Sequence, residues 1–431
     1  MRPLRSLLTL LLSLPLCAQT VVFRNVNVLC MTSPKIAAKQ NVIVRDGKIE
    51  SVSTALAKLP EGTVVIDGSG KYLIPGLAEM HGHIPPPNAP PGVINDVLFE
   101  YLANGITTVR GMLGHPGQLD LRDRAKKGEL VSPNLYLAGP AFIGPAISSP
   151  QEAAEKVKAQ KAEGWDLLKV HEGLTVDEYD SMANTARNEG MRFGGHVPDE
   201  VGLLHAIKMG QETFDHMDGY IEALDGAKGP VDEKKLGEIV KRSKEAGIWI
   251  VPTSALWEVL YCTTPLETLK SYPELKYVPA QSVENWAKMY TDRQSKSSRE
   301  EAKNVVANRA RILRALYKGG VKILMGTDAP QQFSIPGFSL HRELLMMRDA
   351  GMTPYDILAS GTVNVGKYFA KQDAFGTIEP GKRADLVLLG ANPLTDIANV
   401  AKIQGVMVRG KWMSRADLDA GLEKIAAKYK R

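Results

Sequence analysis

The sequence predicts an α/β protein, in which a (β/α)8 TIM barrel is combined with a small β-sandwich formed from both chain ends. Two observations predict this fold. Between residues 73 and 367, eight short apolar segments alternate with helical patterns, as the strands and helices of such a barrel do. Residues 19–72 and 368–431 contain short alternating strands, and neither piece is large enough to bury a core alone. We therefore expect the two end pieces to form one sandwich.

The eight predicted barrel strands are short apolar runs separated by helical or turn patterns. They lie near residues 77–83, 106–110, 134–139, 167–172, 192–196, 213–216, 248–253 and 322–327. Clear helical patterns between them cover residues 149–163, 176–188 and 234–246. In the N-terminal piece, Asp46-Gly47 is typical of a two-residue hairpin turn.

Residues 1–18 have the features of a secretory signal peptide. Arg2 and Arg5 precede a leucine-rich segment that is too short to span a bilayer, and the small Ala18 predicts the cleavage site. Leu16 stands before Cys17, where a lipoprotein signal would need a small residue, so lipid anchoring is disfavoured. We therefore expect a secreted or periplasmic protein with no membrane attachment after cleavage.

The composition of the remaining chain argues against a nucleic-acid or membrane-surface partner. Without the signal peptide, 51 basic residues face 48 acidic ones, and the excess is not clustered. Cys30 and Cys262 are too far apart in the sequence to indicate a disulfide framework, although one bridge between them stays open. A hydrophobic content of 44% fits a globular chain of enzyme size.

Polar side chains end several of the predicted barrel strands, and functional residues lie at these carboxyl ends in a (β/α)8 barrel. His81 and His83 close the first strand, and residues i and i+2 of a strand point the same way. Other strand ends carry further groups that suit a metal: Lys169, His196, His216 and Asp328. Each alone has an ordinary structural explanation, such as helix capping. Six such groups on five strands predict a metal centre.

These motifs together resemble the amidohydrolase superfamily over essentially the whole mature chain. Pro75-Gly76-Leu77 leads into the two histidines of the first strand, and the segment from Gly376 to Val387 resembles the superfamily's closing strands. The nearest branch is the imidazolonepropionase-like and Xaa-Pro dipeptidase (prolidase)-like hydrolases. Residues 168–170, 195–198 and 337–343 carry that similarity. Glu79 departs from the family, which commonly has Asp two residues before the first histidine.

The resemblance implies two divalent metal ions. His81, His83 and Asp328 would bind the buried ion, and His196 and His216 the second. Lys169 would bridge both ions as a carbamate formed with carbon dioxide, because a carbamate supplies two anionic oxygens where an ammonium would repel the cations. Zinc is the metal that histidine donors favour, with nickel, manganese and cobalt left open. A mononuclear site with an unmodified lysine is the main alternative.

The resemblance also implies catalytic and substrate-binding roles. Asp328 would be the general base that takes a proton from the metal-activated water. His171, two residues after Lys169, would polarise the carbonyl or contact the substrate. His115 and His341 would bind substrate at the mouth of the pocket, whereas His205 on a helix has a structural role. The aromatic residues of segment 257–300 suggest an apolar substrate side chain, although packing within that segment explains them equally well.

We expect hydrolysis of a linear amide C–N bond in a small-molecule substrate, either a dipeptide or an N-acyl amino acid. A cyclic-amide hydrolase resembling imidazolonepropionase, or an esterase or lactonase using the same residues, is the alternative. An inactive binding scaffold is the least favoured class, because none of the six expected ligands is missing. The sequence leaves a homo-oligomer open.

Overall fold

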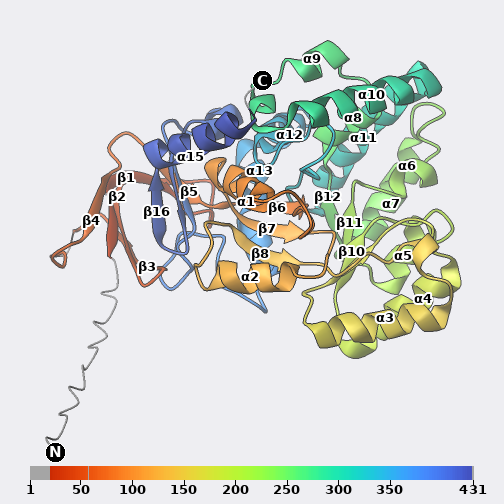
Figure 1. Cartoon of the computed structure of the whole chain (residues 1–431), viewed down its shortest axis with the longest axis horizontal. Helices are drawn as coiled ribbons and strands as arrows, with labels where there is room; N and C mark the ends of the chain where they lie inside the picture. Colours follow the sequence, from red (N-terminus) through yellow and green to blue (C-terminus); the bar gives the residue numbers. More distant parts are fainter. Residues whose placement is uncertain (1–19, 57, 430–431) are drawn as a thin grey trace, which may run out of the picture.

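The computed structural model describes residues 20–56 and 58–429. Figure 1 shows a β-sheet part at one side, built from both chain ends, and an α/β part that follows it. The predicted signal peptide, residues 1–18, lies outside the described residues. Within the described ranges, no helix is long and apolar enough to cross a membrane.

The strands from the two chain ends form one hydrogen-bonded sheet in the order β16-β15-β14-β5-β1-β2-β3, and β4 also pairs with β1. The N-terminal strands are β1 (Val21–Leu29), β2 (Ile36–Arg45), β3 (Lys48–Ser53), β4 (Val64–Asp67) and β5 (Tyr72–Pro75). The C-terminal strands are β14 (Leu386–Leu389), β15 (Ile403–Val408) and β16 (Lys411–Ser414). The β2–β3 hairpin turns at Asp46 and Gly47, both with positive φ (51° and 73°), as the Asp-Gly pair predicts.

This sheet bends over its own hydrophobic core, as a sandwich does. Phe23 on β1 packs edge-on against Trp412 on β16, with ring centres 5.2 Å apart, although three strands lie between them in the sheet order. Leu73 on β5 pairs with Leu388 on β14, so the sheet continues to Pro75, a little beyond the expected boundary at residue 72. The C-terminal helix α15 (Arg415–Lys428) follows β16 and packs against both β15 and β16 and against the barrel helix α1 (Val93–Ala103).

Eight parallel strands form the barrel: β6 (Leu77–Gly82), β7 (Ile106–Gly111), β8 (Asn134–Leu137), β9 (Leu168–Val170), β10 (Phe193–Gly195), β11 (Thr213–Asp215), β12 (Trp249–Val251) and β13 (Lys322–Ile323). They make two ladders, β6-β7-β8 and β9 to β13. A bridge between Ala138 and Leu167 joins the ladders at one seam. At the other seam, the Met80 N–H donates to the Met325 carbonyl at 2.8 Å. The predicted (β/α)8 fold is confirmed.

The helices that follow the strands cover the outside of the barrel. They are α1 (Val93–Ala103), α2 (Gln118–Lys126), α3 (Pro150–Glu163), α4 (Val176–Glu189), α5 (Gly202–Met209), α6 (Tyr220–Ala223), α7 (Glu233–Glu245), α11 (Arg299–Gly319), α12 (Phe338–Asp349), α13 (Pro354–Gly361) and α14 (Val363–Tyr368). Short 3-10 helices cover Gly144–Ala146 and Ile397–Ala401. Side chains cap several helices: Ser149 accepts from the Glu152 N–H at the start of α3, and Thr175 and Glu178 form a capping box on α4.

The insertion between β12 and α11 contains α8 (Ser254–Leu260), α9 (Leu266–Lys270), a 3-10 helix (Pro273–Tyr277) and α10 (Ala280–Lys296). Its apolar residues, among them Leu269, Leu275 and Tyr290, form a hydrophobic cluster separate from the barrel core. Cys262 belongs to this cluster and Cys30 to the core of the end sheet. Both cysteines are free, so the bridge that the sequence left open is not formed between them.

Candidate metal centre

The structure brings the six predicted metal ligands to the carboxyl ends of the barrel strands. His81 lies on β6 and Lys169 on β9. The others follow their strands directly or within a few residues: His83 after β6, His196 after β10, His216 after β11 and Asp328 after β13. These positions lie on one rim because all eight strands run parallel.

The Asp328 carboxylate lies between three imidazoles. Its Oδ1 is 2.5 Å from His83 Nε2 and 3.6 Å from His81 Nε2, and its Oδ2 is 3.7 Å from His216 Nε2. Lys169 adjoins the same space, with Nζ 3.4 Å from His81 Nε2. The His196 ring centre is 4.6 Å from that of His216. We call these six residues the His/Lys/Asp cluster.

Burial favours the neutral form of three imidazoles of the cluster, those of His81, His196 and His216. It lowers the pKa of His81 and of His216 well below the usual range, and neighbouring cationic groups add to the effect. Burial likewise lowers the pKa of His196 to about 3. It also lowers the pKa of Lys169, against the opposing influence of Asp215 and Asp328. Neutral nitrogens carry the lone pairs that a metal needs.

Second contacts set the orientation of three histidine rings through Nδ1. His81 Nδ1 lies 2.7 Å from Asp215 Oδ2, and His196 Nδ1 lies 2.6 Å from Asp218 Oδ2. His216 Nδ1 lies 2.7 Å from the Thr253 hydroxyl. In each ring the contact leaves Nε2 available for another partner, as in histidine metal sites where the second nitrogen bonds a neighbouring group.

Two residues of the cluster, and one residue that contacts it, have a strained backbone. His216 (φ 64°), Thr253 (φ 48°) and Asp328 (φ 63°) adopt the left-handed conformation that favours glycine. Such a conformation costs on the order of 1–3 kcal/mol per residue and concentrates at functional sites. The surrounding structure must therefore hold these three residues in place.

Glu79 supplies part of that restraint. Its Oε1 accepts hydrogen bonds from the Thr327 N–H at 2.8 Å and the His81 N–H at 3.0 Å, and its Oε2 accepts from the Thr327 hydroxyl at 2.6 Å. The carboxylate thus ties β6 to the residue before Asp328. Glutamate, which departs from the family's usual Asp, is buried here and acts through the backbone.

The donor set fits a divalent cation. His83 Nδ1 and His216 Nε2 are buried and have no hydrogen-bond partner among the described residues. A buried unpaired polar atom costs about 1–3 kcal/mol, which a metal at His216 Nε2 would offset. His81, His83 and Asp328 each offer a ligand atom within 4.8 Å of the others. Glu172, His196 and Asp218 form a second such group.

His171 and His115 lie beside the cluster. The His171 ring centre is 4.4 Å from that of His196, and its Nδ1 accepts from the Glu172 N–H at 2.8 Å. Burial, with His196 and Lys169 nearby, lowers the His171 pKa to about 4. His115 is half-buried, and both burial and the neighbouring His83 lower its pKa. Both side chains therefore remain candidates for substrate contact.

His341 lies elsewhere, and its predicted place in the substrate pocket is corrected. It belongs to α12, and its Nε2 is 3.2 Å from Oδ1 of Asn104, the C-cap of α1. The contact joins two outer helices, and Asn104 precedes the amino end of β7, whereas the cluster lies at the carboxyl ends. His205, on α5, pairs with Asp180 of α4 at 2.6 Å. That pairing agrees with a structural role.

One aromatic residue of the insertion reaches the cluster. The Trp257 ring centre is 6.0 Å from that of His216, and the Arg309 guanidinium lies over the indole at 3.7 Å. Tyr277 and Trp286 instead pack against Phe338 and Phe333. Trp257 is thus the insertion aromatic placed to form a wall of the site.

Several residues of the site were not predicted from the sequence: Arg110, Asp215, Asp218, Thr253 and Arg309. Burial alone would raise the pKa of Asp215, but Arg110, Lys169 and His216 together outweigh burial and hold it below its usual value. Asp215 and Asp218 flank His216, and Arg110 ends a predicted strand. The signals available were two carboxylates beside a predicted metal ligand, His216, and an arginine inside an apolar strand.

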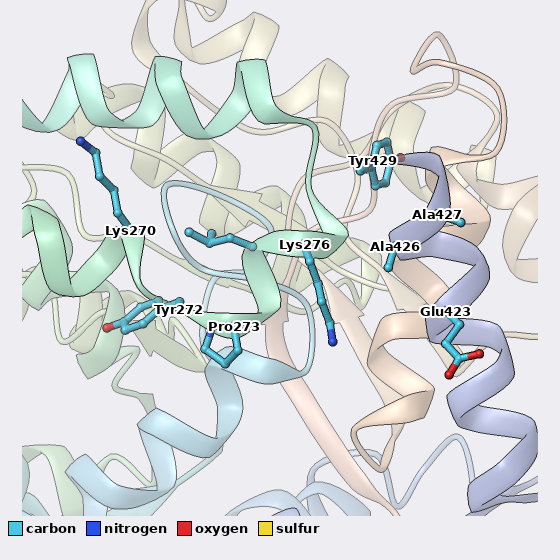
Figure 2. Close-up of a pocket in the computed structure, with 9 residues that line it drawn as sticks. Lys270, Tyr272, Pro273, Lys276, Glu423, Ala426, Ala427 and Tyr429 are labelled. Carbon is cyan, nitrogen blue, oxygen red and sulfur yellow. The ribbon is translucent and has the colours of Figure 1, made fainter. Parts of the chain in front are cut away.

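A cavity of about 580 Å³ lies away from the cluster. Figure 2 shows it between the insertion, which contributes Tyr272, Pro273 and Lys276, and α15, which contributes Ala426 and Tyr429. None of the six cluster residues lines it. It is therefore not the place where the cluster would meet a substrate.

A (β/α)8 barrel with imidazoles, a lysine and a carboxylate at its carboxyl rim defines a hydrolase-type metal site. The comparison with known families agrees: the Amidohydrolase family matches residues 72–413, and the chain belongs to this family. It is accordingly an amidohydrolase, acting on C–N bonds, and the family generally uses divalent metals.

The relatives differ in their reactions. A 5-methylthioadenosine/S-adenosylhomocysteine deaminase of Caldanaerobacter subterraneus subsp. tengcongensis is 24% identical, over 91% of this chain and 92% of the deaminase. A Xaa-Pro dipeptidase structure with bound methionine superposes with a TM-score of 0.70 at 21% identity, over 92% of this chain and all of the dipeptidase. Bottromycin amidohydrolase gives 0.76 at 21%, over 95% of this chain and 91% of that enzyme. The two structures share the fold.

The geometry predicts different metal affinities for two histidine variants. His83→Ala should bind divalent metal more weakly than the unaltered protein, because it removes a group 2.5 Å from Asp328. His341→Ala should keep the metal affinity and lose at most about 1 kcal/mol of unfolding free energy with its hydrogen bond. Equilibrium dialysis with metal analysis, together with denaturant unfolding, measures both. Equal loss of metal in the two variants would contradict the assignment.

Proposed function

We propose that this amidohydrolase uses two divalent metal ions, with zinc favoured, and cleaves a linear amide such as a dipeptide or an N-acyl amino acid. The observation that carries the proposal is Lys169, buried with its Nζ 3.4 Å from His81 Nε2. Imidazolonepropionases and adenosine-deaminase-like members of the superfamily generally lack this lysine. An ammonium among metal ligands would repel the cations, whereas a carbamate would bind them.

The carbamate requires a neutral amine and carbon dioxide. The Nζ lone pair forms a bond to the carbon of CO₂, one C–O π bond becomes an oxyanion lone pair, and the nitrogen releases one proton. Burial lowers the pKa of Lys169 and so favours the neutral amine that this reaction needs. The two carbamate oxygens would supply the anionic charge that the three neutral imidazoles His81, His196 and His216 lack.

The residues of the cluster divide the reaction between them. Bound divalent metal would lower the pKa of a water molecule toward neutrality and polarise the amide carbonyl. Asp328 would accept a proton from the attacking water and return it to the departing nitrogen. His171, beside His196, would contact the carbonyl or the substrate. Trp257 and His115 would form walls around the substrate.

Deamination is the second candidate function, because the deaminase relative matches almost the full length of both chains. Water would then attack a ring carbon and release ammonia. Cyclic-amide, ester or lactone hydrolysis would use the same water and base. A binding scaffold is opposed by the complete set of six groups in one place.

The proposal is tested by assaying metal-loaded protein against four substrate panels. They are Xaa-Pro and Xaa-Arg dipeptides with N-acyl amino acids, adenosine and its 5′-methylthio analogue, cyclic amides, and esters with lactones. We expect turnover on the linear amides, seen as release of a free amine. Ammonia release from the nucleosides with no hydrolysis of linear amides would replace this proposal with the deaminase.

We also propose that the protein is exported, because of the features of residues 1–18. N-terminal sequencing of the protein recovered from a periplasmic or culture fraction should begin at Gln19. Recovery of a chain that still begins at Met1, from the cytoplasm alone, would contradict export.

Substitutions of Lys169 should show whether this side chain bridges two metal ions or acts only through its charge. Lys169→Ala should lose most activity and bind fewer than two metal ions per chain, and short carboxylic acids that fill the bridge should restore part of the activity. Lys169→Arg should not be rescued, because a fixed cation cannot bridge metals. Two tightly bound metals in the alanine variant without added acid would contradict the bridge.

Substitution of Asp328 should separate metal binding from chemistry. Asp328→Asn keeps an oxygen for weak metal binding but removes the proton acceptor, so turnover should fall by about 10²–10⁴-fold while the fold and much of the metal remain. The matched control is His205→Gln, which should change stability at most. If Asp328→Asn keeps near-normal turnover with metal bound, another group moves the proton, and His171 becomes the leading candidate.

A further inference from the structure

Arg110 lies fully buried inside the barrel, and all three nitrogens of its side chain donate hydrogen bonds. Its Nε donates to the Met80 carbonyl at 2.5 Å, and Nη1 donates to the Thr213 hydroxyl at 3.0 Å and the Tyr368 hydroxyl at 3.3 Å. Nη2 donates to both oxygens of Asp215, at 3.0 and 2.9 Å. A guanidinium is not deprotonated in proteins, so this charge is permanent.

Asp215 joins this charge to the His/Lys/Asp cluster. Its side chain has no exposed surface, and Oδ2 lies 2.7 Å from His81 Nδ1 while also accepting from Arg110. A carboxylate held by two guanidinium hydrogen bonds offers only acceptors. His81 Nδ1 must then be the donor in the 2.7 Å contact, because two lone pairs would repel each other at that distance.

The opposite nitrogen of His81 therefore carries the lone pair. His81 Nε2 faces Lys169 Nζ at 3.4 Å and Asp328 Oδ1 at 3.6 Å, which is the centre of the cluster. The partner of His216 differs: the Thr253 hydroxyl can donate or accept, so it orients that ring without imposing a tautomer.

We propose that Arg110 and Asp215 are a positioning pair that fixes His81 as the Nδ1–H tautomer and so makes Nε2 its metal-binding atom. The pair acts from β7 and β11 on a histidine of β6, so three barrel strands determine one ligand. This inference rests on the proposed metal dependence, and it adds two residues that act through His81 without touching the metal.

Asp215→Asn tests the pair directly. The asparagine has the same shape, but only one of its two terminal atoms accepts hydrogen bonds and Arg110 contacts both positions, so the variant no longer imposes one tautomer on His81. Where the NH₂ group faces His81 Nδ1, that nitrogen must accept, and the proton moves to Nε2, where it blocks the metal. We expect zinc affinity to fall about 10–100-fold, measured by competition with a chromophoric chelator.

The tautomer itself is read in metal-free protein by long-range ¹H–¹⁵N NMR of the histidine rings, with His81 assigned by its loss in His81→Gln. The unaltered protein should show only Nδ1–H at His81, and Asp215→Asn should show a measurable population of the Nε2–H form. The matched control is Asp180→Asn, which removes the 2.6 Å carboxylate contact of His205 and should leave zinc affinity unchanged. An equal fall in affinity in both variants would overturn the inference.

A second variant keeps the test decisive if Asp215→Asn does not fold. Arg110→Lys keeps a cation beside Asp215, so His81 should stay Nδ1–H, and the Nε2–H form in this variant would overturn the inference. An Nε2–H form in the unaltered protein would overturn it whatever the activity. If the tautomers and zinc affinities are as expected but the protein hydrolyses no linear amide, only the proposed substrate class is overturned.

Discussion

The ion pair between Arg110 and Asp215 is the constraint on which the rest of the site depends. Removing two charges from water costs several kcal/mol for each ion, and the interior must return that energy through complete hydrogen bonding. The Met80 carbonyl, Thr213 and Tyr368 accept the other hydrogen bonds of the guanidinium. Residues of β6, β11 and α14 therefore all stabilise this buried charge. Such a pair adds little to stability over an apolar core of the same shape. Its effect is to specify how His81 presents its ring.

Residues that follow the strand ends near this pair have strained backbone conformations, which the surrounding barrel must maintain. His216, Thr253 and Asp328 adopt left-handed backbone conformations, and they follow the neighbouring strands β11, β12 and β13. On one side of Asp328, Glu79 accepts a hydrogen bond from the Thr327 N–H. On the other side, the Tyr101 hydroxyl donates to the Ala329 carbonyl at 2.5 Å. Asp328 is thus fixed from both sides along the chain. Its carboxylate can lie among three imidazoles because its backbone has little freedom to move away.

Local patterns were enough to predict which six residues gather in the His/Lys/Asp cluster, but not the residues that orient them. Strand alternation and the barrel rule located His81, His83 and Lys169, because those depend on neighbours in the sequence. The partner of His81 depends on pairing across the barrel, and Asp215 is 134 residues away. His341 was misplaced for a related reason: it follows the last strand in the sequence, but α12 carries it outward to Asn104. The continuation of the end sheet to Pro75 likewise depends on β14, which is more than 300 residues away.

The roles proposed for the cluster are water activation and proton transfer, and these steps are shared by amide hydrolysis and deamination. Selection between a linear amide and a ring must come from the walls around the cluster. Arg309 connects one wall to the cluster, because its guanidinium lies over Trp257 at 3.7 Å, donates to the His216 carbonyl and approaches Asp218 at 3.7 Å. A change in that wall therefore reaches the backbone of a cluster histidine and the carboxylate that orients His196. The Trp257 wall and the His/Lys/Asp cluster are physically coupled through this one side chain, so a substitution that moves Arg309 should disturb both together.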